Sequence, residues 1–381
     1  MKNLILLHIV FLAGVLILSS QTKVEKSLYY SRTGDYNSAM KEISEAVKYP
    51  DLSGLATTWY YRGKIYQEAF MKDESKVYAL DTAYFSLVKA MTLDPDQDYL
   101  KNIIAQLKML STNYYRKGAL DFNDGKYAFA YQSFERALDI NKTPMIAFSD
   151  SGLLFHAGNA AYLSGNYTKA KKHFQKLTGI KVKTMDVYNI LGDIYLNENN
   201  IAMAIETYDS GLDAGSIYSG SLVLKLINIC LKYGKTEEAE KYIEKGKKID
   251  PANAQIHFYE AGLYNLQLQD EKAISAYKRG MLYEPDNYDA NYNTGILLYN
   301  NAIIHKELAD KFKNSDDLKF KQERSEFNNL IMESLKYLEK AYSLDKKDRN
   351  LNYCLLDVYK RLNRPTEAEK VEANMKLQKI Y

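Results

Sequence analysis

Apolar side chains recur along most of the chain at spacings of three and four residues, with charged and amide side chains between them. In the segment 98–122, for example, the apolar series is Leu100, Ile103, Ile104, Leu107 and Leu110. This spacing places the apolar side chains on one face of a helix. The pattern therefore predicts an all-α chain of amphipathic helices.

The helical pattern also repeats itself, at about 34 residues in the middle of the chain. The second half of each repeat carries a small residue followed by bulky ones, as in GKYAFAYQSFERA at 125–137 and GNYTKAKKHFQKL at 165–177. The alanines at the shared position are Ala39, Ala130, Ala170, Ala204, Ala239 and Ala273. The first half carries an aromatic residue, a glycine and a tyrosine, as in WYYRGKIY at 59–66 and VYNILGDIY at 187–195.

These motifs resemble the tetratricopeptide repeat (TPR) family, and the resemblance covers about residues 23 to 375. It implies an all-α, TPR-type α-solenoid of about nine helix-turn-helix units in a right-handed superhelix. A small residue at the crossing of the two helices lets their backbones approach, and bulky residues fill the space beside it. One hairpin cannot bury its apolar face alone, so neighbouring hairpins must stack.

We expect one TPR domain over 21–381, with units at about 21–52, 53–97, 98–145, 149–184, 185–218, 219–252, 253–286, 287–347 and 348–381. Three segments depart from the repeat. The stretch 70–80 is an insertion in a turn or an extension of both helices, and 98–122 is one long helix or includes an added one. After Gly295 the landmarks of the second helix come late, which predicts two long antiparallel helices. Their outer part, 300–330, is either a solvated hairpin without a partner or a contact arm.

The first twenty residues have the order of a secretory signal. One lysine precedes a nearly continuous apolar run from Leu4 to Leu18, and Ser19 and Ser20 follow. We expect a cleaved signal peptide at 1–20, with an uncleaved anchor as the alternative. The first cysteine is Cys230, so a lipoprotein anchor is not expected. This predicts an exported protein of the periplasm or cell envelope.

Composition and motifs favour neither an enzyme nor a nucleic-acid-binding protein. The 51 basic and 48 acidic residues give a net charge of +3, without a concentrated basic face. The sequence contains no HExxH, GxSxG, phosphate-loop or CxxC motif. Cys230 and Cys354 fit two small buried apolar residues, although an exported chain permits a disulfide between them. We expect no catalysis, no metal and no small-molecule cofactor.

The resemblance places binding on the first helices, which line a concave groove in TPR stacks. Asparagine can both donate to and accept from a peptide backbone, and tyrosine provides contact area at low entropic cost. The candidate partner-binding residues are Tyr60, Lys64, Tyr115, Phe122, Phe155, Asn159, Tyr162, Asn189, Asp193, Asn228, Phe258, Tyr292, Tyr299 and Tyr353. The family favours tyrosine at two of these positions, so part of the aromatic surface is generic.

The sequence therefore predicts a non-catalytic, exported TPR scaffold or adaptor that holds a protein or peptide partner in its groove. Its Lys-, Asn-, Ile- and Tyr-rich composition is similar to that of exported TPR proteins of Bacteroidota. That similarity implies association with an outer-membrane or secretion assembly. A glycan-binding helical protein of the cell envelope is the alternative, because tyrosine also stacks on sugar rings. The polar C-terminal stretch 363–381 can cap the stack, which favours a monomer.

Overall fold

The computed structural model describes residues 22–143, 146, 150–180, 185–213 and 219–377, and these residues form helices and turns without any strand. The expected all-α fold is confirmed. The signal peptide expected at 1–20 lies outside the described residues. Within the ranges just given, no helix combines the length and the apolar character needed to cross a membrane. The chain divides between Asn199 and Asn200 into two compact units, and each is described by itself.

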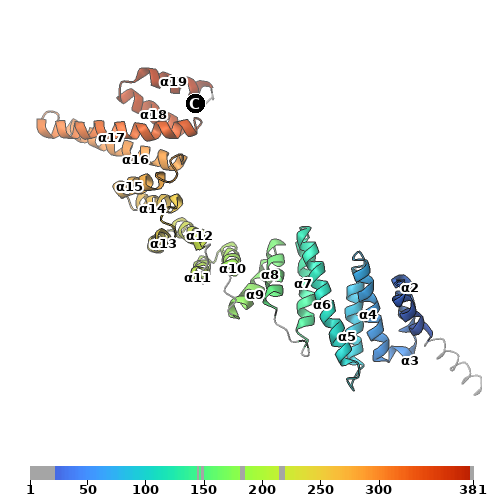
Figure 1. The fold of residues 1–381 in the computed structure, drawn as a ribbon. Helices are drawn as coiled ribbons and strands as arrows, with labels where there is room; N and C mark the ends of the chain where they lie inside the picture. The colour runs from blue at the N-terminus through green and yellow to red at the C-terminus, as the bar shows by residue number, and fades with distance from the viewer. Residues whose placement is uncertain (1–21, 144–145, 147–149, 181–184, 214–218, 378–381) are drawn as a thin grey trace, which may run out of the picture. The chain divides into compact units, whose positions relative to one another are not determined.

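The first unit stacks helical hairpins (Figure 1). After the helical residues 22–32, its helices are α2 (Tyr36–Ala46), α3 (Pro50–Ser53), α4 (Ala56–Lys72), α5 (Tyr78–Thr92), α6 (Leu100–Asn123), α7 (Tyr127–Asn141), α8 (Ser151–Leu163), α9 (Tyr167–Gly179) and α10 (Met185–Asn197). The segment 70–80 extends both α4 and α5, leaving a short turn between them. The segment 98–122 forms one continuous helix, α6.

The second unit continues with hairpins of the same kind. Its helices are α11 (Ile201–Asp213), α12 (Ser219–Lys232), α13 (Thr236–Ile249), α14 (Ala254–Leu266), α15 (Asp270–Met281), α16 (Tyr288–Phe312), α17 (Asp317–Leu344), α18 (Arg349–Arg361) and α19 (Pro365–Leu377). The helices α16 and α17 are 25 and 28 residues long, about twice the length of their neighbours. The elongated hairpin expected after Gly295 is therefore confirmed.

The two helices of a hairpin approach most closely at the glycine of the first helix. A Cβ atom on Gly63 would lie 2.6 Å from Cγ of Leu87 on the facing helix. One on Gly295 would lie 2.6 Å from Cδ2 of Leu338 and 3.2 Å from its backbone nitrogen. These distances are shorter than carbon contacts allow, so only glycine fits without movement. The crossing geometry that the repeat motif implies is confirmed.

Several neighbouring hairpins are joined by a polar contact at a fixed place in the repeat, five residues after the small residue of the second helix. We call it the junction position. At the first junction, Tyr66 Oη on α4 lies 2.7 Å from Ser44 Oγ on α2. Near the end of the chain, Tyr359 Oη on α18 donates to Glu339 on α17 over 2.8 Å. Further contacts of this kind join Gln175 to Tyr195, Asp209 to Lys241, and Lys278 to Glu333.

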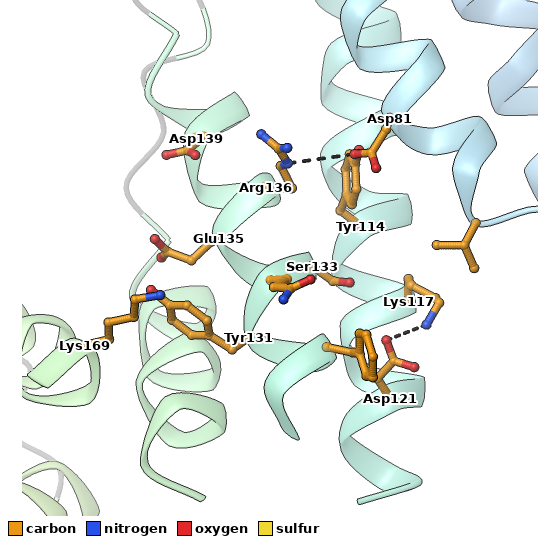
Figure 2. Close-up of a pocket in the computed structure, with 13 residues that line it drawn as sticks. Asp81, Tyr114, Lys117, Asp121, Tyr131, Ser133, Glu135, Arg136, Asp139 and Lys169 are labelled. Carbon is orange, nitrogen blue, oxygen red and sulfur yellow. Dashed lines mark hydrogen bonds and ion pairs between the residues drawn. The ribbon is translucent and has the colours of Figure 1, made fainter. Parts of the chain in front are cut away.

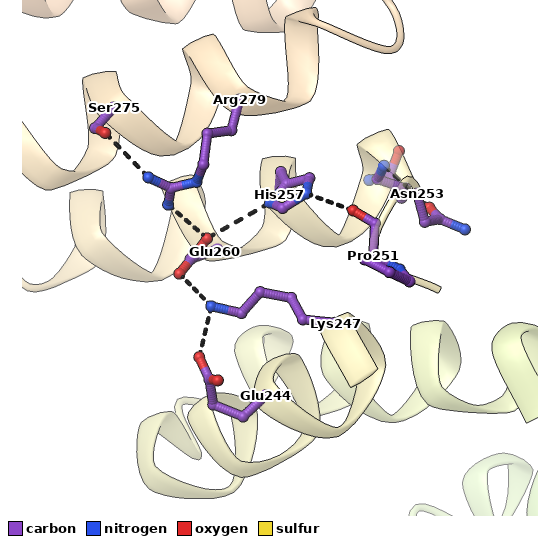
Figure 3. A network of polar contacts seen from close by, with 9 residues as sticks. Glu244, Lys247, Pro251, Asn253, His257, Glu260, Ser275 and Arg279 are labelled. Atoms are coloured by element: carbon purple, nitrogen blue, oxygen red, sulfur yellow. Dashed lines mark hydrogen bonds and ion pairs between the residues drawn. The ribbon is translucent and has the colours of Figure 1, made fainter. Parts of the chain in front are cut away.

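A buried carboxylate connects three helices in the second unit (Figure 3). Glu260 on α14 is only 4% exposed. It accepts hydrogen bonds of 2.8 Å from Lys247 on α13 and from Arg279 on α15. Burial would raise the pKa of Glu260, but the hydrogen bonds and charges of these two cations hold it below its usual value. The ionised carboxylate therefore links the α14–α15 hairpin to the one before it.

The glycine crossing can be tested by adding one methyl group. We expect Gly295→Ala to lower the melting temperature, because overpacking a core costs about 1–3 kcal/mol. Gly262→Ala, on α14, is the matched control because a Cβ atom there meets nothing within 4 Å. That control should be neutral or stabilising by up to about 1 kcal/mol, since alanine favours helix over glycine. Equal melting temperatures for the two variants would contradict the packing described here.

The Glu260 network predicts a pH dependence of stability. The pKa of Glu260 is lowered in the folded state, so its contribution is present above the unfolded value of about 4.3 and is lost as pH falls through the folded value. Glu260→Gln should be less stable at pH 7 by about 1–3 kcal/mol, since the amide accepts fewer hydrogen bonds from the two cations. Thermal melts of both proteins from pH 7 to pH 3 should converge. Parallel curves over that range would exclude this role for Glu260.

Candidate protein-binding surface

The first helices of the first unit carry aromatic side chains that keep access to solvent. Tyr60 on α4 is half-buried, and its ring centroid lies 5.9 Å from that of Tyr99. Burial raises the pKa of Tyr60, so its hydroxyl stays protonated at neutral pH and can donate a hydrogen bond. Lys64, one turn on, is half-buried, and its ammonium lies 3.8 Å from Glu68. The surface of α4 therefore presents the ring of Tyr60 and the ammonium group of Lys64, which is partly paired with Glu68.

The helices α6 and α8 bring further aromatic rings together. Tyr115 on α6 is 38% exposed, and its ring centroid lies 5.6 Å from that of His156 on α8. Phe155 packs at 6.0 Å from Phe174 in the core. His156 is half-buried beside Tyr115.

The remaining candidates of the first unit are all half-buried: Phe122, Asn159, Tyr162, Asn189 and Asp193. Phe122 and Tyr162 each pack on a tyrosine at the start of the following second helix, with centroid distances of 5.2 and 5.6 Å. Burial, and then the charge of Asp193 on α10, raise the pKa of Tyr162 on α8. Their binding role stays a prediction.

In the second unit the candidates differ in exposure. Asn228 on α12 is exposed, and Tyr353 on α18 is 44% exposed, with the Arg349 guanidinium 5.6 Å from its ring. Tyr292 on α16 is half-buried and stacks on Tyr288, with a centroid distance of 5.9 Å.

Two further candidates of this unit make internal contacts. Tyr299 is half-buried and donates a hydrogen bond to Asp357 on α18. Phe258 does not lie on an accessible face, because it is only 9% exposed. Its ring occupies the space beside Gly280, where a Cβ atom would lie 2.3 Å from Cε1 of the phenylalanine. The predicted groove position of Phe258 is therefore wrong.

A pocket of about 460 Å³ lies among α5, α6, α7 and α9 of the first unit, away from the predicted residues (Figure 2). Tyr114 donates a hydrogen bond of 2.6 Å to Asp81, whose carboxylate also lies 3.8 Å from Arg136. Lys117 pairs with Asp121 in its wall. The sequence interpretation missed this pocket because it considered only first helices. The ion pairs Asp81–Arg136 and Lys117–Asp121 lie within its walls, so these four charged groups connect neighbouring helices or turns and are not free for a ligand.

The described residues give no indication of a metal centre. No group of three or more His, Cys, Asp or Glu residues among them could hold a metal ion. Cys230 is buried and Cys354 half-buried, and both are free thiols, so the disulfide alternative is not formed in this structure. Burial raises the pKa of Cys230 to about 11. This thiol is therefore protonated at neutral pH.

Comparison with known proteins identifies the repeat. Residues 186–214 and 228–253 match the sequence model of the tetratricopeptide repeat. The human RanBP2-like and GRIP domain-containing protein 3 is 26% identical over 217 residues, which are 55% of this chain and 12% of that protein. The chain thus matches only a small part of that relative's length.

Two solved structures are similar at low sequence identity. The C-terminal part of a TPR repeat-containing protein from Cytophaga hutchinsonii is 14% identical, covers 68% of this chain and 93% of its own, and has a TM-score of 0.45. A tetratricopeptide repeat protein from Parabacteroides merdae is 12% identical, covers 71% and 98%, and has a TM-score of 0.42.

Proposed function

Because this chain belongs to the tetratricopeptide repeat family, we propose that it is a non-catalytic scaffold that binds a protein or peptide partner on the aromatic surface of its first helices. The observation that carries this proposal is the accessible series of rings on α4, α6 and α8. Tyr60, Tyr115 and Tyr162 come from three successive hairpins, and each keeps part of its ring in solvent. Rings held by their neighbours lose little conformational entropy when a partner covers them.

The chemistry of this surface suits a polypeptide. The hydroxyls of Tyr60 and Tyr162 are protonated at neutral pH, and burial raises their pKa values further, so they can donate to peptide carbonyl groups. The half-buried Asn159 adds an amide that can both donate and accept. The surface carries little positive charge apart from Lys64, so a partner anchored by a terminal carboxylate is a poor fit.

Export is the second part of the proposal. The charge, apolar run and small polar residues of 1–20 support a cleaved secretory signal. The mature protein would then act in the periplasm or cell envelope, in association with an outer-membrane or secretion assembly. N-terminal sequencing of the chain recovered from the envelope fraction tests this part. A mature chain that still begins at Met1 would favour the uncleaved anchor.

The binding surface predicts a hot spot at Tyr115. We expect Tyr115→Ala to weaken binding of the native partner by about 30-fold, equivalent to roughly 2 kcal/mol at an aromatic hot spot. Tyr78→Ala is the matched control, because Tyr78 is 58% exposed but lies on a second helix, α5. A photo-crosslinking residue at each position, in the full chain in its native envelope, identifies the partner. Binding affinities of the two alanine variants are then measured by calorimetry.

The outcomes separate the competing functions. A protein crosslink from position 115 but not from position 78 supports the proposal. Equal crosslinking from both positions, or equal loss of affinity in both alanine variants, would contradict it. The glycan alternative rests on the same exposed tyrosine rings. It is favoured if Tyr115→Ala loses retention on an envelope-glycan column while no protein crosslinks to the intact chain.

A further inference from the structure

Many of the turns that follow a first helix share one backbone geometry. Their first residue beyond the cap of the first helix has a positive φ, between 54° and 83°. The described residues at this place are Gly34, Gly125, Gly165, Asn199, Gly234, Leu268 and Asn363. Glycine and asparagine adopt this left-handed conformation readily. Leu268, with a φ of 58°, is the exception, and a left-handed leucine costs about 1–2 kcal/mol.

The packing of the chain does not offset the strain at Leu268. The side chain is 88% exposed, so it buries almost no apolar surface within the described structure. The backbone of the turn is unchanged, since the Gln269 amide donates to the Tyr264 carbonyl over 2.9 Å, as the glycine turns do at their equivalent residues. A strained backbone at an exposed bulky residue is a reason to look for a role outside the fold.

Leu268 lies at the edge of a cleft in the second unit. The cleft has a volume of about 650 Å³ and lies between the α14–α15 turn, α15 and the long α16–α17 hairpin. Ile304 on α16 is 55% exposed and lines it, together with the partly buried Leu330 on α17. Leu298, 3% exposed, is among the core residues that line it. The hairpin that departs from the repeat period therefore supplies one wall of this cleft, with apolar side chains in it.

Acidic side chains outnumber basic ones in the same cleft, whose lining also includes Asn301 and His305. Asp270, Glu271 and Glu326 line it, and none of them makes an ion pair within the described structure. The cation in the lining, Lys272, lies 5.5 Å from the ring of Tyr264. Gln269 Oε1 is buried in the wall and has no hydrogen-bond partner among the described residues. A ligand that fits must bring donors and positive charge.

We propose that this cleft is a second docking site, for a protein segment that presents a leucine-like side chain next to lysine or arginine. The apolar side chain packs on Leu268 and Ile304, and burial of Leu268 offsets the strain of its turn. The basic side chain faces the three carboxylates that lack an ion-pair partner. Charge complementarity selects this partner over an acidic segment. The site does not use the aromatic rings of α4, α6 and α8, so it can be tested independently of the binding surface proposed there.

The key variant is Leu268→Asn, and its control is Leu318→Asn. Asparagine already occupies the equivalent turn position at 199 and 363, so the first variant should melt at the same or a higher temperature than the native chain. Leu318 is 81% exposed on α17 and is not part of the cleft. Both variants lose one exposed leucine from the second unit. They differ in whether that leucine lines the cleft.

The probe is a random 12-residue peptide library on phage, selected on the full-length native chain and depleted on Leu268→Asn. We expect the enriched peptides to combine leucine, isoleucine or methionine with lysine or arginine. A labelled enriched peptide, followed by fluorescence anisotropy, should bind Leu318→Asn as tightly as the native chain. It should bind Leu268→Asn at least about tenfold more weakly, which corresponds to about 1.4 kcal/mol. Replacing its basic residues by glutamate should weaken binding to the native chain by a similar factor.

Three results would overturn the proposal. The first is an enriched peptide that binds Leu268→Asn within twofold of the native chain. The second is a selection that yields acidic peptides, or none that distinguish the two proteins. The third is self-association of the native chain in sedimentation equilibrium that Leu268→Asn abolishes, since the occupant would then be a second copy. The first-helix variant Tyr115→Ala should bind the enriched peptide normally, so failure at one surface is distinguishable from failure at the other.

Discussion

The close approach of two helices at a glycine is the constraint on which the rest of the structure depends. At Gly63 and Gly295 a leucine of the second helix occupies the space where a Cβ atom would lie, and at Gly118 Phe134 does the same. Because this contact fixes how each first helix is rotated, it also decides which side chains of that helix face outward. Tyr115 on α6 lies three residues before Gly118, on the same side of the helix, and its ring centroid is 5.7 Å from that of Phe134 while 38% of the residue stays exposed. At α6 the proposed binding surface therefore begins at the edge of the helix crossing.

The helices and the elongated hairpin could be predicted because their signals are local. Apolar spacing defines a helix, and a late second-helix landmark after Gly295 shows an added length of chain. Phe258 was misplaced because its orientation depends on Gly280 of the facing second helix. The groove positions were predicted by comparing first helices alone. The pocket around Tyr114 was missed because four helices supply its walls. The sequence shows where Leu268 lies in the repeat. Its positive φ and its exposure can be seen only in the three-dimensional structure.

Charge inside the stack has a different role from charge on its surface. Glu260 is buried and fully paired, so it joins hairpins and has no oxygen left for a partner. The carboxylates Asp270, Glu271 and Glu326 lie at an open cleft and have no ion-pair partner within the described structure. Removing one member of a buried pair destabilises a fold, whereas unpaired surface charges mainly select and steer partners. The second unit thus contains both uses of the same chemical group.

The junction contacts also have a mechanical consequence. Each one, such as Ser44 with Tyr66 or Glu339 with Tyr359, joins a hairpin only to the next, so the junctions within a unit are connected in series. A pulling force applied along such a unit is carried in full by every junction. The unit is therefore as strong as its weakest junction, and it opens there first while the hairpins on either side stay folded.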